Sequence, residues 1–208
     1  IICDGQGTEF YCIINSVTNE CVLAQIEDIN QSKAELPVKI YLFQGLPKKD
    51  KMELIIQKAV ELGVYEIIPV VTKRTIVKID DRKKESKKLE RWQTIATSAA
   101  KQCGRGIIPK VCNPISFQEA IRRAMDLDYN LIPYENAEGK AISRELIYKS
   151  AEYNTVGVFI GPEGGFEEQE VEQAIAKDFM AVTLGKRILR TETASISVLS
   201  IIMLQCEE

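Results

Sequence analysis

Two segments near the end of the chain combine residue types that could form a binding site. The first, GPEGGF at residues 161–166, places three glycines and a proline between a strand-like run and a helix-like run. The second, LGKRILRTETA at residues 184–194, contains a connection of about nine residues, where α/β connections usually need about 2 to 6. Glycine allows a ligand to approach the backbone closely, and the long connection adds charged and hydroxyl groups. Both segments are therefore candidates for a ligand site.

The glycine-rich segment does not resemble a phosphate-binding loop. It matches neither GxxxxGK[ST] nor GxGxxG. Glu167, Glu168 and Glu170 fall in the first turn of the helix expected after it, where carboxylates already complement the helix dipole and would repel a pyrophosphate. The segment therefore predicts a ligand that is neutral or cationic near this loop. The alternative is a purely structural turn in which Pro162 sets one φ angle.

The residue types that are absent limit the chemistry. The chain has no histidine, so Ser-His-Asp and Cys-His nucleophiles are excluded within these residues, and a general base must be a carboxylate, lysine, tyrosine or water. Six cysteines occur without a CxxC pair, which disfavours zinc and indicates buried thiols in a reducing compartment. No run approaches the roughly 20 apolar residues of a membrane span. We therefore expect a cytoplasmic protein without metal.

The net charge is −3, but the cations are clustered. The clusters are Lys48, Lys49 and Lys51; Lys73 and Arg74; six cations in residues 82–91; and Lys186, Arg187 and Arg190. A charge run on a helix is most often a solvated face. Clusters at the starts of several elements, in a mildly acidic protein, favour a local anionic partner.

The elements that position these segments alternate between strand and helix. Residues 1–35 read as short strands and turns, which we interpret as a fragment of a small β-barrel or meander, with further residues expected before Ile1. From residue 36 onward, apolar strand-like runs alternate with amphipathic helix-like runs up to residue 208. Strands are expected at 39–45, 66–72, 129–135, 155–161 and 180–185, and helices at 49–63, 90–104, 117–125, 141–152 and 167–179. This alternation predicts an α/β domain, with a mostly parallel sheet covered by helices on both faces and ligands beyond the carboxyl ends of its strands.

The last helix differs from the others because it has almost no polar face. We expect it to start near Ser195, with Thr193 or Ser195 as its N-cap, and to run through ISVLSIIMLQ. An apolar helix is buried on all sides. Its position at the end of the chain therefore predicts a homodimer, in which a second subunit covers the remaining side.

The two C-terminal motifs together resemble a known family. LGKRILRTETA and IGPEGGF, in this order and spacing, are similar to the bacterial 16S ribosomal RNA (uridine-N3) methyltransferases of the SPOUT class. GLPKKDKMELIIQKAVELGV, PVVTKRT, ERWQTIATSAAKQCGR and LIPYE extend the resemblance over residues 38–208. It implies a C-terminal trefoil knot, an N-terminal PUA-like barrel, S-adenosylmethionine as cofactor, a homodimer, and 16S rRNA or the small ribosomal subunit as partner.

The resemblance also assigns roles to individual residues. The cofactor-binding residues it implies are Leu131, Pro133, Tyr134, Ile160, Gly161, Pro162, Glu163, Gly164, Gly165, Leu184, Gly185, Ile188, Leu189, Thr193 and Ala194. In catalysis, Arg190 would orient the uracil, while Glu135, Glu192 or a water would accept the proton from N3. The RNA-binding candidates are Lys48, Lys49, Lys73, Arg74 and Arg105, with the run at residues 82–91. The alternatives are methylation of another base or of a ribose 2'-oxygen, or a non-catalytic RNA-binding module.

Overall fold

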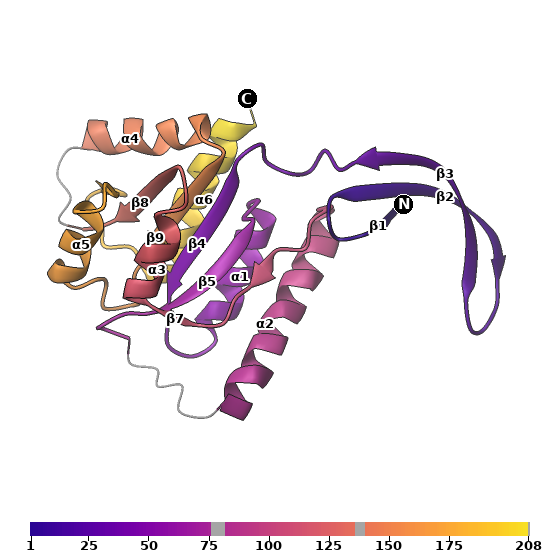
Figure 1. The fold of residues 1–208 in the computed structure, drawn as a ribbon, viewed down its shortest axis with the longest axis horizontal. Helices are drawn as coiled ribbons and strands as arrows, with labels where there is room; N and C mark the ends of the chain where they lie inside the picture. Colours follow the sequence, from indigo (N-terminus) through magenta and orange to yellow (C-terminus); the bar gives the residue numbers. More distant parts are fainter. Residues whose placement is uncertain (76–81, 136–139, 208) are drawn as a thin grey trace.

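The computed structural model describes residues 1–75, 82–135 and 140–207. Within them, one parallel sheet forms the centre of the main domain, in the order β10-β8-β9-β4-β5-β6 with β7 beside β5 (Figure 1). Its strands are β4 (Lys39–Gly45), β5 (Glu66–Val71), β6 (Lys110–Val111), β7 (Ile115–Ser116), β8 (Tyr129–Pro133), β9 (Thr155–Ile160) and β10 (Met180–Val182). The five strands expected from the sequence are all present, and each joins this parallel sheet.

Helices cover both faces of this sheet, as the sequence predicts. They are α1 (Lys51–Glu61), α2 (Arg82–Cys103), α3 (Phe117–Ala124), α4 (Lys140–Lys149), α5 (Glu168–Ile175) and α6 (Thr191–Cys206), with a 3-10 turn at Ser150–Glu152. Adjacent strand residues point to opposite faces. Leu42 accordingly belongs to the core under α1, α2 and α6, while Phe43 belongs to the core under α3 and α5. The sheet is therefore buried on both sides.

The helical pattern of α1 explains its position. Met52, Ile55, Ile56, Ala59 and Val60 lie at helical spacing and are buried against the sheet. The helix stops before Gly63, whose φ of 84° favours glycine. The loop that leads into α1, residues 46–50, follows directly from the carboxyl end of β4. The first residue of α1 therefore lies near the carboxyl ends of the strands, where ligands bind in such folds.

Two helices start several residues before the position that the sequence predicts. The helix expected from residue 90 begins at Arg82, so the basic run at residues 82–91 forms its first turns; the side chains of residues 82–85 lie outside the described part. The last helix begins at Thr191 rather than near Ser195. Its N-cap is Arg190, without a side-chain capping bond, so the predicted caps at Thr193 and Ser195 are wrong. Buried polar contacts of Thr191, described below, fix this earlier start.

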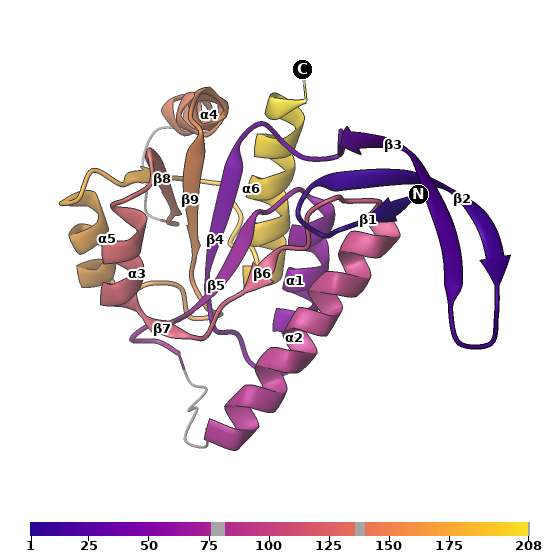
Figure 2. The same cartoon turned by 45° about the vertical axis from the view of Figure 1, so that its right-hand side comes forward.

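The N-terminal residues form a separate three-stranded antiparallel sheet, made of β1 (Ile2–Cys3), β2 (Thr8–Val17) and β3 (Val22–Gln31). The β2–β3 hairpin extends away from the main domain (Figures 1 and 2). Backbone hydrogen bonds from Gly7 to Gly106 and from Ile108 to Gly5 attach this sheet to the segment after α2. The described strands are open rather than closed, and the PUA-like barrel stays a prediction.

Candidate functional site

A cavity of about 390 Å³ lies at the carboxyl ends of β8, β9 and β10. Three segments supply most of its wall: residues 133–135, 160–166 and 183–189, with two residues from the first turns of α6. The lining residues are Pro133, Tyr134, Glu135, Ile160, Gly161, Pro162, Glu163, Gly164, Gly165, Phe166, Thr183, Leu184, Gly185, Lys186, Arg187, Ile188, Leu189, Thr191 and Ala194. The cavity is therefore where an α/β sheet usually binds its ligand.

The length of the connection before α6 follows from the strand order. The connection comprises residues 183–190, which leave β10 at one edge of the sheet. It ends at Thr191, whose hydroxyl contacts Gly161 after β9 and Gln44 at the end of β4. With strands about 4.8 Å apart, three strand spacings require roughly 14 Å. A two-residue loop reaches only about 7 Å, so a longer crossing is necessary.

Glycine allows the β4 and β9 ends to approach each other. A Cβ atom added to Gly45 would lie 2.6 Å from the Pro162 nitrogen, and one added to Gly161 would lie 2.9 Å from the Gly165 carbonyl carbon. Real Cβ atoms do not tolerate such contacts. Gly45 and Gly161 are therefore required by packing, and the second of them belongs to the cavity wall.

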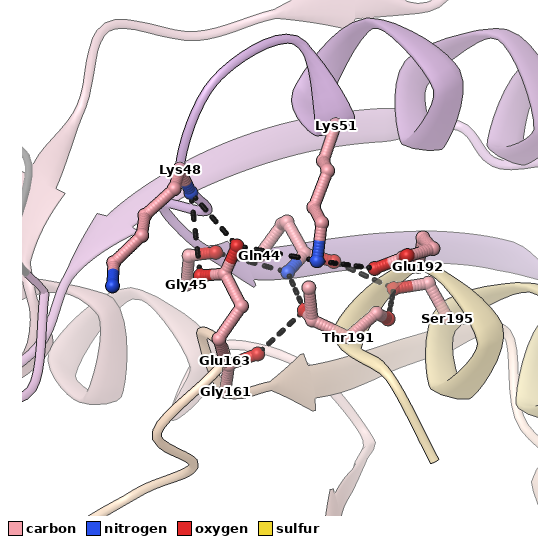
Figure 3. Close-up of polar contacts among 9 residues, drawn as sticks. All are labelled: Gln44, Gly45, Lys48, Lys51, Gly161, Glu163, Thr191, Glu192 and Ser195. Carbon is pink, nitrogen blue, oxygen red and sulfur yellow. Dashed lines mark hydrogen bonds and ion pairs between the residues drawn. The ribbon is translucent and has the colours of Figure 1, made fainter.

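A buried polar network ties the start of α6, directly after the crossing, to β4 (Figure 3). The Gln44 side chain is fully buried; its Nε2 donates to Thr191 Oγ1 at 2.9 Å, and its Oε1 accepts from Ser195 Oγ at 2.6 Å. Thr191 Oγ1 in turn donates to the Gly161 carbonyl at 2.7 Å. Satisfied buried networks of this kind specify one arrangement of their segments. The network thus fixes the start of α6 against the ends of β4 and β9.

A second cluster is ionic and partly exposed. The Lys51 ammonium lies 3.3 Å from Glu163 Oε1 and 3.2 Å from Glu192 Oε2, so one cation pairs with two carboxylates. The Lys48 backbone N–H also donates to Glu163, while the Lys48 ammonium points away from Glu163 (Figure 3). Partial burial acts to raise the pKa of Glu163, but backbone hydrogen bonds and the Lys51 ammonium outweigh it and lower that pKa.

The glutamates at the start of α5 are used locally. Glu167 and Glu170 form a capping box, and buried Glu170 also accepts from the Lys73 backbone N–H at 3.0 Å. These carboxylates satisfy the helix start that would otherwise attract a phosphate. They agree with the sequence argument against a phosphate ligand in this turn.

Most of the predicted cofactor residues lie together on the cavity wall, but two do not. Leu131 is fully buried in the core beneath the site, and Thr193 is exposed on α6 outside the lining. Of the three catalytic candidates, Glu135 lines the cavity. Arg190 is exposed between two lining residues, and Glu192 faces Lys51.

The RNA-binding candidates separate into exposed and buried residues. Lys48, Lys49 and Lys73 are exposed, and Arg74 is exposed while donating to the Gly164 carbonyl at 2.7 Å. The prediction for Arg105 is corrected. Its side chain is only 4% exposed, pairs with Glu35 and donates to the backbone carbonyls of Val60 and Val64. Arg105 therefore presents no surface to RNA.

Sequence reasoning missed three residues that organise the site: Gln44, Lys51 and Thr191. Gln44 carried a usable signal, because a polar residue at the end of the apolar strand KIYLFQG must find buried partners. Lys51 carried no such signal, since it stands in a cluster of similar lysines.

Neither a membrane span nor a metal site is found in the part of the chain that the structure describes. None of its helices combines the length and apolar character of a membrane span, and no three His, Cys, Asp or Glu side chains group as metal ligands would.

Comparison with known proteins identifies the family. Residues 34–203 match the model of the RNA methyltransferase domain. Ribosomal RNA small subunit methyltransferase E of Bacillus subtilis is 40% identical over all of this chain and 82% of its own length, and that of Mesomycoplasma hyopneumoniae is 37% identical over 96% and 83%.

Solved structures agree with this relationship. The small subunit methyltransferase E of Neisseria gonorrhoeae, bound to S-adenosylmethionine, has a TM-score of 0.83 and 35% identity over 97% of this chain and 81% of its own. A methyltransferase of Legionella pneumophila, also with bound S-adenosylmethionine, has a TM-score of 0.81 and 34% identity over the same shares. The chain therefore belongs to the ribosomal RNA small subunit methyltransferase E family.

Proposed function

We propose that this protein transfers a methyl group from S-adenosylmethionine to N3 of a uridine in the 16S rRNA of the small ribosomal subunit. One observation carries the proposal: the cavity formed by the three loops beyond β8, β9 and β10, in a chain of this family. The cofactor comes from the two relatives that bind it. The uridine N3 target comes from the resemblance of LGKRILRTETA and IGPEGGF.

The residues of the cavity fit this cofactor. S-adenosylmethionine has no phosphate and carries a positive sulfonium, which suits a glycine turn followed by glutamates rather than basic residues. Gly161, Gly164 and Gly165 leave backbone as the wall of one side, and residues 184–189 provide backbone groups on the other. When bound, the cofactor supplies an electrophilic methyl group to the attacking ring nitrogen.

The reaction also requires that uridine N3 lose its proton. Of the carboxylates considered from the sequence, Glu135 lines the cavity, whereas Glu192 is held by Lys51. We therefore assign proton acceptance to Glu135 or to a water beside it. Arg190, exposed at the start of α6, would orient the uracil and stabilise the negative charge that develops on it.

RNA binding would use the exposed cations around the cavity. The target base must leave its stack to reach the methyl donor, and cations then hold the flanking backbone. The candidates are Lys48, Lys49, Lys73 and Arg74, with Lys186 and Arg187 on the cavity wall itself. Affinity for single-stranded RNA should then fall with salt at a slope of roughly 0.7 per phosphate neutralised.

A knotted chain and a homodimer belong to the same proposal. The crossing before α6 is long enough to pass beneath another loop, and α6 is apolar around most of its circumference, with Leu204 62% exposed. A second subunit packed on α6 would cover this face. Light scattering after size exclusion should then report twice the mass of the chain. The same proposal places the protein in the cytoplasm, where ribosomal subunits are assembled.

The experiment that tests the function is mass spectrometry of rRNA from cells that lack this protein. We expect one methyl group to be missing, at N3 of a single 16S rRNA uridine. A missing methyl on another base or on a ribose 2'-oxygen would contradict the target. If every rRNA methyl persisted and the purified protein failed to bind S-adenosylmethionine, a non-catalytic RNA-binding module would be the better interpretation.

A further inference from the structure

We infer that Lys51 is a positioning residue, whose ammonium holds the glycine turn and the start of α6 in the arrangement that binds S-adenosylmethionine. The inference rests on the proposed function and deepens it. Lys51 does not line the cavity. It would act through Glu163, which belongs to the turn after β9, and Glu192, which belongs to the first turn of α6.

The geometry places a single cation against two carboxylates. Glu163 Oε1 and Glu192 Oε2 lie 3.3 Å and 3.2 Å from the same nitrogen, so they are separated by no more than about twice that distance. Their side chains are only 27% and 14% exposed, so water screens them incompletely. Without Lys51, the like charges of Glu163 and Glu192 would repel each other and separate the glycine turn from the start of α6.

The placement of Lys51 is unfavourable for its own helix. Lys51 is the first residue of α1, where the helix dipole disfavours a cation. The loop before it carries Lys49 at φ 56°, a left-handed conformation that is strained for a residue other than glycine. Both features are local costs. Contacts outside α1 account for these costs, because the position of the Lys51 ammonium is then set by Glu163 and Glu192.

The loop backbone supports the same arrangement. The Lys48 N–H donates to both carboxylate oxygens of Glu163, at 3.0 Å and 3.2 Å, and this bifurcated hydrogen bond fastens the turn after β9 to the loop after β4. Gly45, at the end of β4, also packs directly against Pro162, the residue before Glu163. Lys51 is the one member of the group that also reaches α6, and it therefore joins the three segments.

The chain offers a matched control. Lys58 lies on the same helix and pairs with Glu61 at 2.8 Å, with side chains 37% and 26% exposed, close to the 31% and 27% of Lys51 and Glu163. Lys58 is not on a cavity segment. Lys58→Met therefore removes an ion pair of similar exposure from α1 without touching the arrangement of the two carboxylates.

The test is calorimetric titration of the full chain with S-adenosylmethionine. We expect Lys51→Met to raise the Kd about tenfold, Lys51→Arg to stay within about threefold of wild type, and Lys58→Met to match wild type. In turnover assays the KM for the cofactor should rise while kcat at saturation changes little. The double variant Lys51→Met with Glu192→Gln should recover most of the lost affinity, because the repulsion is removed.

Two results would overturn the inference. One is a Lys51→Met variant that binds the cofactor as tightly as Lys58→Met. The other is a loss of affinity that Glu192→Gln does not relieve, which would indicate that Lys51 acts only through packing. Lys51→Gln gives the same comparison if Lys51→Met does not fold. Failure of the wild-type protein to bind S-adenosylmethionine would instead reject the proposed function.

Discussion

Two ion-pair clusters with different roles occur in the molecule, at opposite ends of the sheet. At one end, Arg105 is buried, pairs with a single carboxylate and also donates to the carbonyls of Val60 and Val64. At the other, Lys51 is 31% exposed and faces two carboxylates beside the cavity. In the first cluster one cation is matched by one carboxylate, and the cluster fastens the N-terminal segment to α1. The second has excess negative charge and joins the segments of a site.

The largest expected effect is a loss of stability when the buried cluster around Arg105 is broken. Arg105→Met would leave the Glu35 carboxylate without its cation and the Val64 carbonyl without its donor, and we expect a loss of about 3 to 5 kcal/mol in the free energy of unfolding. Arg91→Met, which removes an exposed pair with Glu53, should cost about 0 to 1 kcal/mol. Urea unfolding measures both. Equal losses in the two variants would contradict a structural role for Arg105.

The next effect concerns turnover rather than stability. Arg190→Ala should lower kcat about 100-fold, because the fixed charge that stabilises the uracil anion is removed, while cofactor affinity stays near wild type. Single-turnover assays with labelled S-adenosylmethionine give the rate, and calorimetry gives the affinity. An unchanged rate would remove Arg190 from the mechanism and leave the exposed arginine as a surface residue.

The polar network next to the ionic cluster should show an intermediate effect. Thr191→Val keeps the side-chain shape but removes the donor to Gly161 and the acceptor for Gln44, so we expect a loss of about 1 to 3 kcal/mol in unfolding free energy. Thr94→Val, on the exposed side of α2, should change stability by less than about 0.5 kcal/mol. If the two variants matched, the network would not fix the start of α6.

The smallest effect is a pH dependence of the ionic cluster. The folded chain lowers the pKa of Glu163 below its usual 4.5, so its ionised form contributes stability that is present above that pH and is lost as pH falls through the folded-state pKa. Wild type should therefore be more stable than Glu163→Gln near neutral pH, and the difference should shrink below about pH 4.5. A difference that stayed constant down to about pH 3 would contradict the ion pairs.

The contrast between Arg105 and Lys51 also shows where sequence reasoning stops. Alternating apolar runs predicted the parallel sheet and both helix layers, because the strand and helix periods are local properties of the chain. The role of a cation depends instead on partners distant in sequence. Glu35 lies 70 residues before Arg105 in the chain, and Glu163 and Glu192 lie far beyond Lys51. No local pattern could separate these two cations from their basic neighbours.

The same reason explains the error at the start of α6. Thr-Glu-Thr reads as a loop, because β-branched threonine is a modest helix former and suits a cap. In the structure Thr191 is buried and bonded to Gln44 and Gly161, and these tertiary contacts outweigh the local preference. The glycine turn was easier to predict, since its packing demand appears directly as glycine and proline in the sequence.

Methyl transfer to purified small ribosomal subunits tests the proposed function most directly. Subunits from cells that lack this protein would be incubated with the purified chain and isotopically labelled S-adenosylmethionine, and their rRNA nucleosides would be analysed by mass spectrometry. We predict label in 3-methyluridine alone, at one position of 16S rRNA. Label in another nucleoside, or none despite measured cofactor binding, would contradict the account.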